Sequence, residues 1–143
     1  MEKKNNFLFG ICLGKQLLYS LSEENIVSTG LNLIKGKVTK ITVNKKFKLP
    51  NVGWNEIIIK KKNLNIFHYL KNFDNKKFYF VHSFKGIPSS KEDIIATSVF
   101  NNINFCSIVT NQKKNILGVQ FHPEKSADNG LEFLKLLIKN HID

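Results

Sequence analysis

The sequence predicts a single α/β domain, because apolar strand-like runs alternate with segments of helical spacing along its 143 residues. Near the start, the apolar run 7–11 enters a glycine-flanked turn and continues into a helix that begins near Leu13. Near the end, apolar residues at helical spacing predict a second helix after Ser126. A chain of this length can bury a core of its own. It contains no run of 18 or more apolar residues, so no membrane span is expected.

The elements between these ends are expected in a definite order. Apolar residues at positions 13, 17, 18 and 21 predict that the first helix covers 13–21. Strands are expected over 36–43, 57–59 and 78–81, with a short helix within 65–70. Three further strands, over 94–100, 105–110 and 116–121, have the pattern of consecutive hairpins.

The last helix is expected to begin with a cap and to bury one apolar stripe. Ser126 is placed to cap its first turn, and Asp128 to interact with the positive end of the helix dipole. The expected stripe is formed by Leu131, Leu134 and Ile138, widened by Phe133 and Leu137.

The turn after the first strand has the pattern of a nucleophile elbow. Gly10 and Gly14 lie two residues on either side of Cys12, which lets the backbone turn sharply and project the thiol out of the sheet. The N-terminus of the following helix would favour the thiolate and lower the pKa of the thiol. The alternative interpretation is a buried structural cysteine, which is expected for Cys106 in its apolar stretch.

A second motif supplies a base and an acid. The apolar stretch 117–121 leads into His122-Pro123-Glu124, in which Glu124 can orient the His122 ring and stabilise its protonated form. Cysteine, histidine and carboxylate are the three groups that acyl transfer through a thioester needs. The alternative is a surface turn. His82 is a poor candidate for the base, because no acid follows it.

The charge and the cysteine content limit the class of protein. The formal net charge is +11, but all 22 basic residues are lysines that are spread along the chain, which argues against specific nucleic-acid recognition. Two cysteines far apart fit a reducing cytoplasm better than a disulfide framework. The sequence shows no metal-ligand cluster and no glycine-rich phosphate loop, so neither a metal nor a cofactor is expected.

Four motifs in order resemble the class I glutamine amidotransferases, and within them the glutaminase subunits of imidazole glycerol phosphate synthase. They lie at residues 10–18, 50–56, 79–84 and 118–126. The resemblance implies a three-layer, flavodoxin-like α/β fold with added antiparallel strands. It also implies hydrolysis of glutamine through a cysteine thioester. The ammonia would pass to a (β/α)₈-barrel cyclase, the partner in a heterodimer of histidine biosynthesis.

The resemblance assigns a role to each site residue. Cys12 would be the nucleophile, His122 the base and Glu124 its orienting acid, while the backbone N–H of Leu13 would contribute to an oxyanion hole. The substrate would be held by Gln16, Glu24 and the backbone at Ser83 and Phe84, and the cyclase would contact Trp54, Asn55 and Lys125. Lys15 departs from the methionine usual in this family. A cation three residues after Cys12 could lower the pKa of the thiol further, but Lys15 is expected to point into solvent.

The resemblance covers residues 1–143 as the C-terminal two-thirds of the family's domain. The glycine-rich loop that completes the family's oxyanion hole precedes the elbow strand, and the present sequence starts only a few residues before that strand. We therefore expect little glutaminase activity from these 143 residues alone. Three alternatives stay open: a non-catalytic or decayed partner-binding remnant, an ammonia donor to a surface-sugar synthase, and a cysteine hydrolase of γ-glutamyl bonds.

Overall fold

A computed structural model of the chain describes residues 6–24 and 26–142. Its largest sheet has five strands, of which β1 and β11 are parallel and the other neighbours antiparallel. In spatial order they are β1 (Leu8–Ile11), β11 (Ile116–Val119), β10 (Ile103–Thr110), β9 (Ile94–Phe100) and β6 (Ile58–Ile59). The parallel pairing brings the carboxyl ends of β1 and β11, which precede Cys12 and His122, to the same rim of this sheet.

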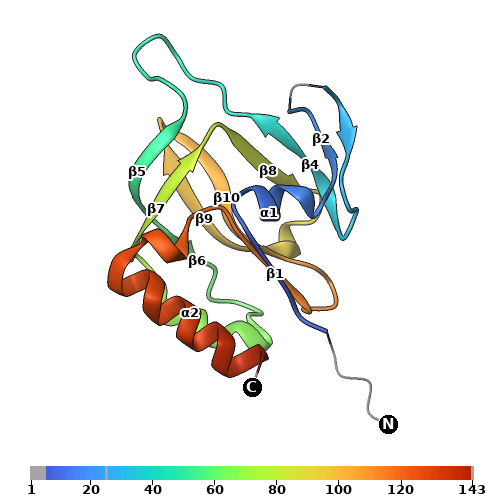
Figure 1. The fold of residues 1–143 in the computed structure, drawn as a ribbon, viewed down its shortest axis with the longest axis vertical. Coiled ribbons are helices and arrows are strands. Elements are labelled where there is room, and N and C mark those ends of the chain that lie inside the picture. Colours follow the sequence, from blue (N-terminus) through green and yellow to red (C-terminus); the bar gives the residue numbers. More distant parts are fainter. Residues whose placement is uncertain (1–5, 25, 143) are drawn as a thin grey trace.

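Two smaller sheets flank it. The first runs in the order β3 (Ser28–Thr29), β2 (Tyr19–Ser22), β4 (Ile34–Lys40) and β8 (Phe84–Pro88), and the second pairs β5 (Asn51–Glu56) with β7 (Lys77–His82). The helical segments are α1 (Leu13–Leu17), α2 (Ala127–His141) and the 3₁₀ segments η1 (Asn65–Phe73), η2 (Lys91–Asp93) and η3 (Pro123–Lys125). Figure 1 shows α2 and α1 on opposite sides of the five-stranded sheet.

The two faces of this sheet carry separate apolar cores. Strand β10 supplies both, because its side chains alternate across the sheet and a β-bulge follows Cys106. Phe105 and Ile108 pack into the core under α2, whereas Cys106 and Val109 pack into the core under α1. The layer of α2, the five-stranded sheet and the layer of α1 together make the three-layer α/β arrangement that the resemblance implies.

Most of the predicted strands are confirmed. Strand β9 has the expected bounds, β7, β10 and β11 differ from theirs by a few residues, and β9, β10 and β11 form the expected antiparallel hairpins. The predicted strand over 36–43 begins and ends earlier, as β4. The short helix expected within 65–70 is the longer segment η1.

The first helix is shorter than predicted. Helix α1 ends at Leu17, and the next residues form β2, which pairs in parallel with β4. The apolar spacing over 13–21 therefore continues past the end of the helix. Leu18 lies in the turn after α1 and packs into a core, and Leu21 belongs to β2. On α1 itself the buried side chains are Lys15 and Gln16, and Leu17 is 51% exposed.

The apolar stripe of α2 is also displaced from its predicted position. The residues that bury are Gly130, Phe133 and Leu137, while Leu131 and Ile138 are 54% and 44% exposed. Gly130 is needed because a Cβ there would lie 1.8 Å from the carbonyl oxygen of Pro123. Ser126 precedes the helix as predicted but does not cap it with its side chain. Its hydroxyl instead donates to the His122 carbonyl and accepts from the Tyr79 amide.

Candidate active site

Cys12 lies on a strained turn between β1 and α1. Its backbone has φ 51° and ψ −106°, a conformation that ordinary side chains rarely adopt. The turn is held to the sheet by a hydrogen bond of 2.8 Å from the Cys12 amide to the Val119 carbonyl. A Cβ at Gly10 would lie 2.9 Å from the carbonyl of Gly14, so this close approach requires glycine. The local geometry is that of the elbow expected from the sequence.

The Cys12 thiol is half-buried and has two weak polar partners. Sγ donates to the Val81 carbonyl at 3.7 Å and accepts from Gln120 Nε2 at 3.8 Å. Burial raises the pKa of the thiol, and the Leu13 amide, Gln120 and Lys15 oppose this increase while Glu124 adds to it. The sequence predicts that the helix N-terminus lowers the pKa of the Cys12 thiol. The pKa is raised instead, because the effect of burial is larger than that of the Leu13 backbone amide.

His122 is bound to Glu124 as the sequence predicts. Its Nδ1 lies 2.5 Å from Glu124 Oε1, with side-chain exposures of 19% for the histidine and 45% for the glutamate. The contact orients the ring and leaves Nε2 available to exchange a proton. The two residues are joined through the start of η3 rather than by extended backbone.

Cys12 and His122 lie at the same rim of the sheet and contact the same strand. The Cys12 thiol contacts the carbonyl of Val81, and the His122 amide donates to the carbonyl of Tyr79 at 2.9 Å. These carbonyls are two residues apart on β7, a spacing of about 7 Å along a strand. No hydrogen bond joins the Cys12 thiol to the His122 ring in this structure. The Cys12 thiol is turned toward Val81 and Gln120 instead.

His82 has a structural environment. It is 5% exposed, its Nδ1 bonds the Phe84 carbonyl at 2.8 Å and its Nε2 bonds Asn51 Nδ2 at 3.1 Å. Because the carbonyl can only accept, Nδ1 carries the proton and Nε2 accepts from the amide. Burial lowers the pKa of His82 to about 4. The ring is therefore neutral near pH 7 and both of its nitrogens are in use.

Lys15 is not in solvent, so that expectation is wrong. Its side chain is 0% exposed, and Nζ donates to the Cys106 carbonyl at 3.1 Å and lies 5.3 Å from the centre of the Tyr19 ring. The stem has room because Gly118, opposite Gly10 on the neighbouring strand, has no side chain. The lysine follows Cys12 by one helical turn, which places it on the inner face of α1.

Gln120 is a site residue that the sequence analysis missed. It is fully buried, its amide nitrogen faces Cys12 and its Oε1 has no hydrogen-bond partner among the described residues. The sequence feature that could have identified it is a lone amide two residues before His122, in the otherwise apolar stretch 117–121. A buried amide with one free polar atom is a group that a bound substrate can satisfy.

The expected substrate residues are only partly gathered at Cys12. The backbone amide of Leu13 faces the thiol. Gln16 is buried one turn later, and its backbone amide donates to the Cys12 carbonyl at 3.2 Å. The carbonyls of Ser83 and Phe84, directly after β7, already accept from the Ile41 amide and from His82. Glu24 lies beyond β2, and its side chain contacts neither Cys12 nor His122 by a hydrogen bond or ion pair among the described residues.

The expected partner residues lie near His122. Trp54 pairs with Tyr79 across β5 and β7, its ring meets the Tyr79 ring at 5.9 Å, and it is 48% exposed. Asn55, the next residue, has a buried Nδ2 without a partner among the described residues. Lys125 is exposed directly after Glu124. These side chains come from two elements, β5 and η3, that meet at β7.

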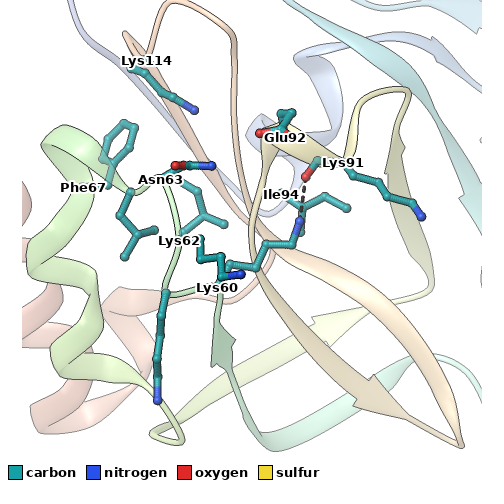
Figure 2. A pocket seen from close by; sticks show the side chains of 11 residues that line it. Lys60, Lys62, Asn63, Phe67, Lys91, Glu92, Ile94 and Lys114 are labelled. Carbon is teal, nitrogen blue, oxygen red and sulfur yellow. Dashed lines mark hydrogen bonds between the residues drawn. The ribbon is translucent and has the colours of Figure 1, made fainter.

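A lysine-lined pocket of about 380 Å³ lies away from Cys12 (Figure 2). Its lining includes Lys114, next to Asn115, whose carbonyl accepts from the amide of Leu8 at the start of β1. Cys12 follows the other end of that strand. In Figure 2, Lys60 reaches the Lys91 carbonyl, a hydrogen bond of 2.8 Å.

Within residues 6–24 and 26–142, no three His, Cys, Asp or Glu side chains are grouped to hold a metal. Over the same residues, no helix is long and apolar enough to cross a membrane.

An elbow cysteine and a Glu-bound histidine thus lie at one rim of a three-layer α/β fold. Residues 2–139 match the family described as glutamine amidotransferase class-I, so the chain belongs to the class I glutamine amidotransferases. This confirms the resemblance inferred from the four motifs.

Three curated relatives carry the name imidazole glycerol phosphate synthase subunit HisH. The protein of Pyrococcus furiosus is 46% identical over 126 residues, which are 88% of this chain and 61% of that protein. The protein of Chlorobium chlorochromatii is 47% identical over 131 residues, 92% and 62% of the two chains. That of Pelagibacter ubique is 46% identical over 129 residues, 90% and 59%. The chain thus spans about three fifths of the length of the curated relatives it matches.

Proposed function

We propose that this chain carries the catalytic residues of a glutaminase that hydrolyses glutamine to glutamate and ammonia. The observation that supports this most strongly is that the elbow thiol of Cys12 and the Glu124-bound ring of His122 lie at one rim, beside the same strand. Membership of the glutamine amidotransferase family supports a carboxamide as the substrate group.

In the proposed mechanism, Cys12 and His122 exchange one proton in each half of the reaction. The Cys12 side chain turns from the Val81 carbonyl toward His122 Nε2, which accepts the thiol proton. The sulfur attacks the carboxamide carbon, and the protonated ring returns the proton to ammonia as the carbon–nitrogen bond breaks. Nε2 then takes a proton from water as the water oxygen attacks the thioester. When the carbon–sulfur bond breaks, the ring returns this proton to the Cys12 sulfur and glutamate is released. Glu124 stabilises the protonated ring throughout.

The backbone and the buried amides support this chemistry. The Leu13 amide, already directed at the thiol, donates to the oxygen that gains charge, an interaction worth about 3–4 kcal/mol for a single donor. Gln120, whose amide faces the thiol, and Gln16, buried one turn after Cys12, hold the substrate together with the backbone at Ser83 and Phe84. Glu24 is proposed for the α-amino group of glutamine.

The proposed recipient of the ammonia is a (β/α)₈-barrel cyclase of histidine biosynthesis, bound as a heterodimer through Trp54, Asn55 and Lys125. The relatives named as subunits of imidazole glycerol phosphate synthase support this partner. The exposed Trp54 beside Tyr79 and the exposed Lys125 offer the aromatic and cationic contacts that interfaces favour. The two free cysteines fit a cytoplasmic enzyme.

Covalent labelling tests the proposed nucleophile. A diazo-ketone analogue of glutamine is incubated with the purified chain, and the modified peptide is identified by mass spectrometry. We expect a single adduct on Cys12, no adduct in C12S, and at least tenfold slower labelling in H122A. Labelling of Cys106 instead, or no labelling of the folded chain, would contradict the proposal and favour the non-catalytic partner-binding remnant.

A binding experiment tests the partner. The histidine-pathway cyclase barrel and a surface-sugar synthase barrel are each titrated with the chain, and ammonia release from glutamine is measured in parallel. We expect binding and stimulated release with the cyclase barrel, both weakened by Trp54→Ala. Preference for the surface-sugar synthase would retain the glutaminase but replace the recipient.

A further inference from the structure

Lys15 brings a positive charge into the apolar core beneath the elbow. The side chain is fully buried in the layer that also contains Leu18, Tyr19 and Cys106. Its ammonium has one carbonyl acceptor, that of Cys106 at 3.1 Å, and one aromatic face, that of Tyr19 at 5.3 Å. A carbonyl oxygen and the face of a ring both favour the charged form of the amine over the neutral form.

The geometry places this charge close to the nucleophile. Cys12 directly precedes α1, and Lys15 lies three residues further on, within the helix. Both side chains also meet the end of β11 or the residue just after it, since Lys15 packs on Gly118 and Cys12 accepts from Gln120. Two residues of a chain span at most about 7 Å, so the thiol and the lysine stem contact neighbouring positions of one segment.

The titratable groups around Lys15 leave its charge uncompensated. They are Cys12 before α1, Tyr19 on β2, Cys106 on β10 and His82 at the end of β7. None of them is a carboxylate, and Lys15 forms no ion pair within the described part of the chain. The nearest groups able to bear a negative charge are therefore thiols and a phenol.

We propose that Lys15 is a positioning residue for the reaction of Cys12, because its buried ammonium lies beneath the elbow and stabilises the thiolate form of the nucleophile. The inference rests on the proposed role of Cys12 and adds a charged group to the Leu13 amide and Gln120, which also oppose the effect of its burial. The lysine neither touches the substrate nor exchanges a proton with it. Consistently, the Lys15 charge lowers the pKa of Cys12, whereas burial lowers the pKa of Lys15 and the thiolates of Cys106 and Cys12 raise it.

Alkylation of Cys12 across a pH series tests the inference. The full chain and its variants are treated with iodoacetamide between pH 5 and about 10, and the rate at Cys12 is read separately from that at Cys106 by peptide mass spectrometry. Lys15→Met removes the charge and keeps the apolar stem, whereas Lys15→Gln provides a second neutral side chain. Lys113→Met, in the exposed β10–β11 turn, is the matched control for loss of one surface charge.

We expect the inflection of the Cys12 rate to move up by roughly one pH unit in both Lys15 variants, the order of shift that one nearby charge causes in a partly buried site. The rate near pH 7 falls about five- to tenfold, since the higher nucleophilicity of a more basic thiolate offsets part of the loss. Lys113→Met leaves the profile unchanged.

Two results would overturn the inference. One is a profile that coincides in the wild-type chain and in both Lys15 variants, and the other is an equal shift in Lys113→Met. Because iodoacetamide needs no glutamine site, this readout is independent of the diazo-ketone labelling. A chain that ignores the glutamine analogue but shows the Lys15-dependent shift would reject the glutaminase and keep the electrostatic role of Lys15.

Discussion

The ammonium of Lys15 is held by one carbonyl and one aromatic ring in an otherwise apolar layer. Moving a charge out of water costs far more than such contacts return unless a counter-ion compensates it. The core under α1 is therefore less stable with this lysine than with an apolar side chain of similar length. Residues that reduce stability are typical of functional sites, and Lys15 lies beneath the proposed nucleophile Cys12.

Lys15→Met is accordingly expected to stabilise the fold by about 1–3 kcal/mol, because it removes the uncompensated charge and fills the same space. The gain also depends on pH. Burial lowers the pKa of Lys15 below 10.5, so the unfolded chain holds this proton to a higher pH than the folded chain does, and the charge penalty is relieved as the pH rises toward 10.5. Urea unfolding at pH 7 and near pH 10, with Lys113→Met as control, should show a gain that shrinks at the higher pH. A loss of stability at pH 7 would contradict this account.

His82 predicts acid sensitivity. Its folded pKa of about 4 lies below the 6.5 of an ordinary histidine, so the unfolded chain binds the extra proton between these values. The free energy of unfolding should therefore fall as the pH drops from about 6.5 toward 4, by about 3 kcal/mol in total for this residue. His141, whose pKa burial also lowers, adds to the same trend.

The measurement is the midpoint of urea unfolding at several pH values between 4 and 7. His82→Gln should flatten the decrease while lowering stability at pH 7, because the amide replaces only part of the hydrogen bonding of the ring. His68→Gln, at an exposed histidine, is the matched control. An unchanged slope in His82→Gln would contradict the role given to His82.

The elbow is an element whose two glycines are not equivalent. A Cβ at Gly10 would meet the backbone of Gly14 at 2.9 Å, whereas a Cβ at Gly14 would meet nothing within 4 Å. Gly10→Ala should therefore cost about 2–3 kcal/mol, because rigid backbone must move. Gly14→Ala should be neutral or stabilising by up to about 1 kcal/mol, since alanine favours helix α1. Thermal unfolding of the two variants checks this, and equal destabilisation would contradict it.

The strands and the site motifs were predictable because their signals are local. The hairpins β9–β11 follow apolar runs between turns, and the Cys12 turn and His122–Glu124 contact follow residue spacing. The end of α1 was not predictable, because Leu18 and Leu21 continue its spacing while belonging to the turn and to β2. Pairing of β2 with β4, a contact distant in sequence, decides that boundary. Lys15 was misplaced because its burial depends on space left by Gly118 on another element.

The outer side of α1 leaves an apolar surface on the molecule. Leu13, Leu17, Leu31 and Leu33 are 44–62% exposed, and Leu17 and Leu31 are joined by a backbone hydrogen bond of 2.8 Å. Within the described residues, the neighbouring strand β1 pairs only with β11, so one edge of the five-stranded sheet is open. Exposed leucines beside an open edge favour association.

We expect the purified chain to self-associate through this surface in a concentration-dependent way. The net charge of +11 opposes contact between copies at low salt, so association should strengthen as salt screens the repulsion. Leu17→Glu should weaken it by placing a charge in the middle of the leucines, whereas Leu131→Glu, at a comparably exposed leucine of α2, should not. Sedimentation at two salt concentrations distinguishes these outcomes. A chain that stays monomeric at high salt, or one in which both variants behave alike, would show that this apolar surface does not drive contact between copies.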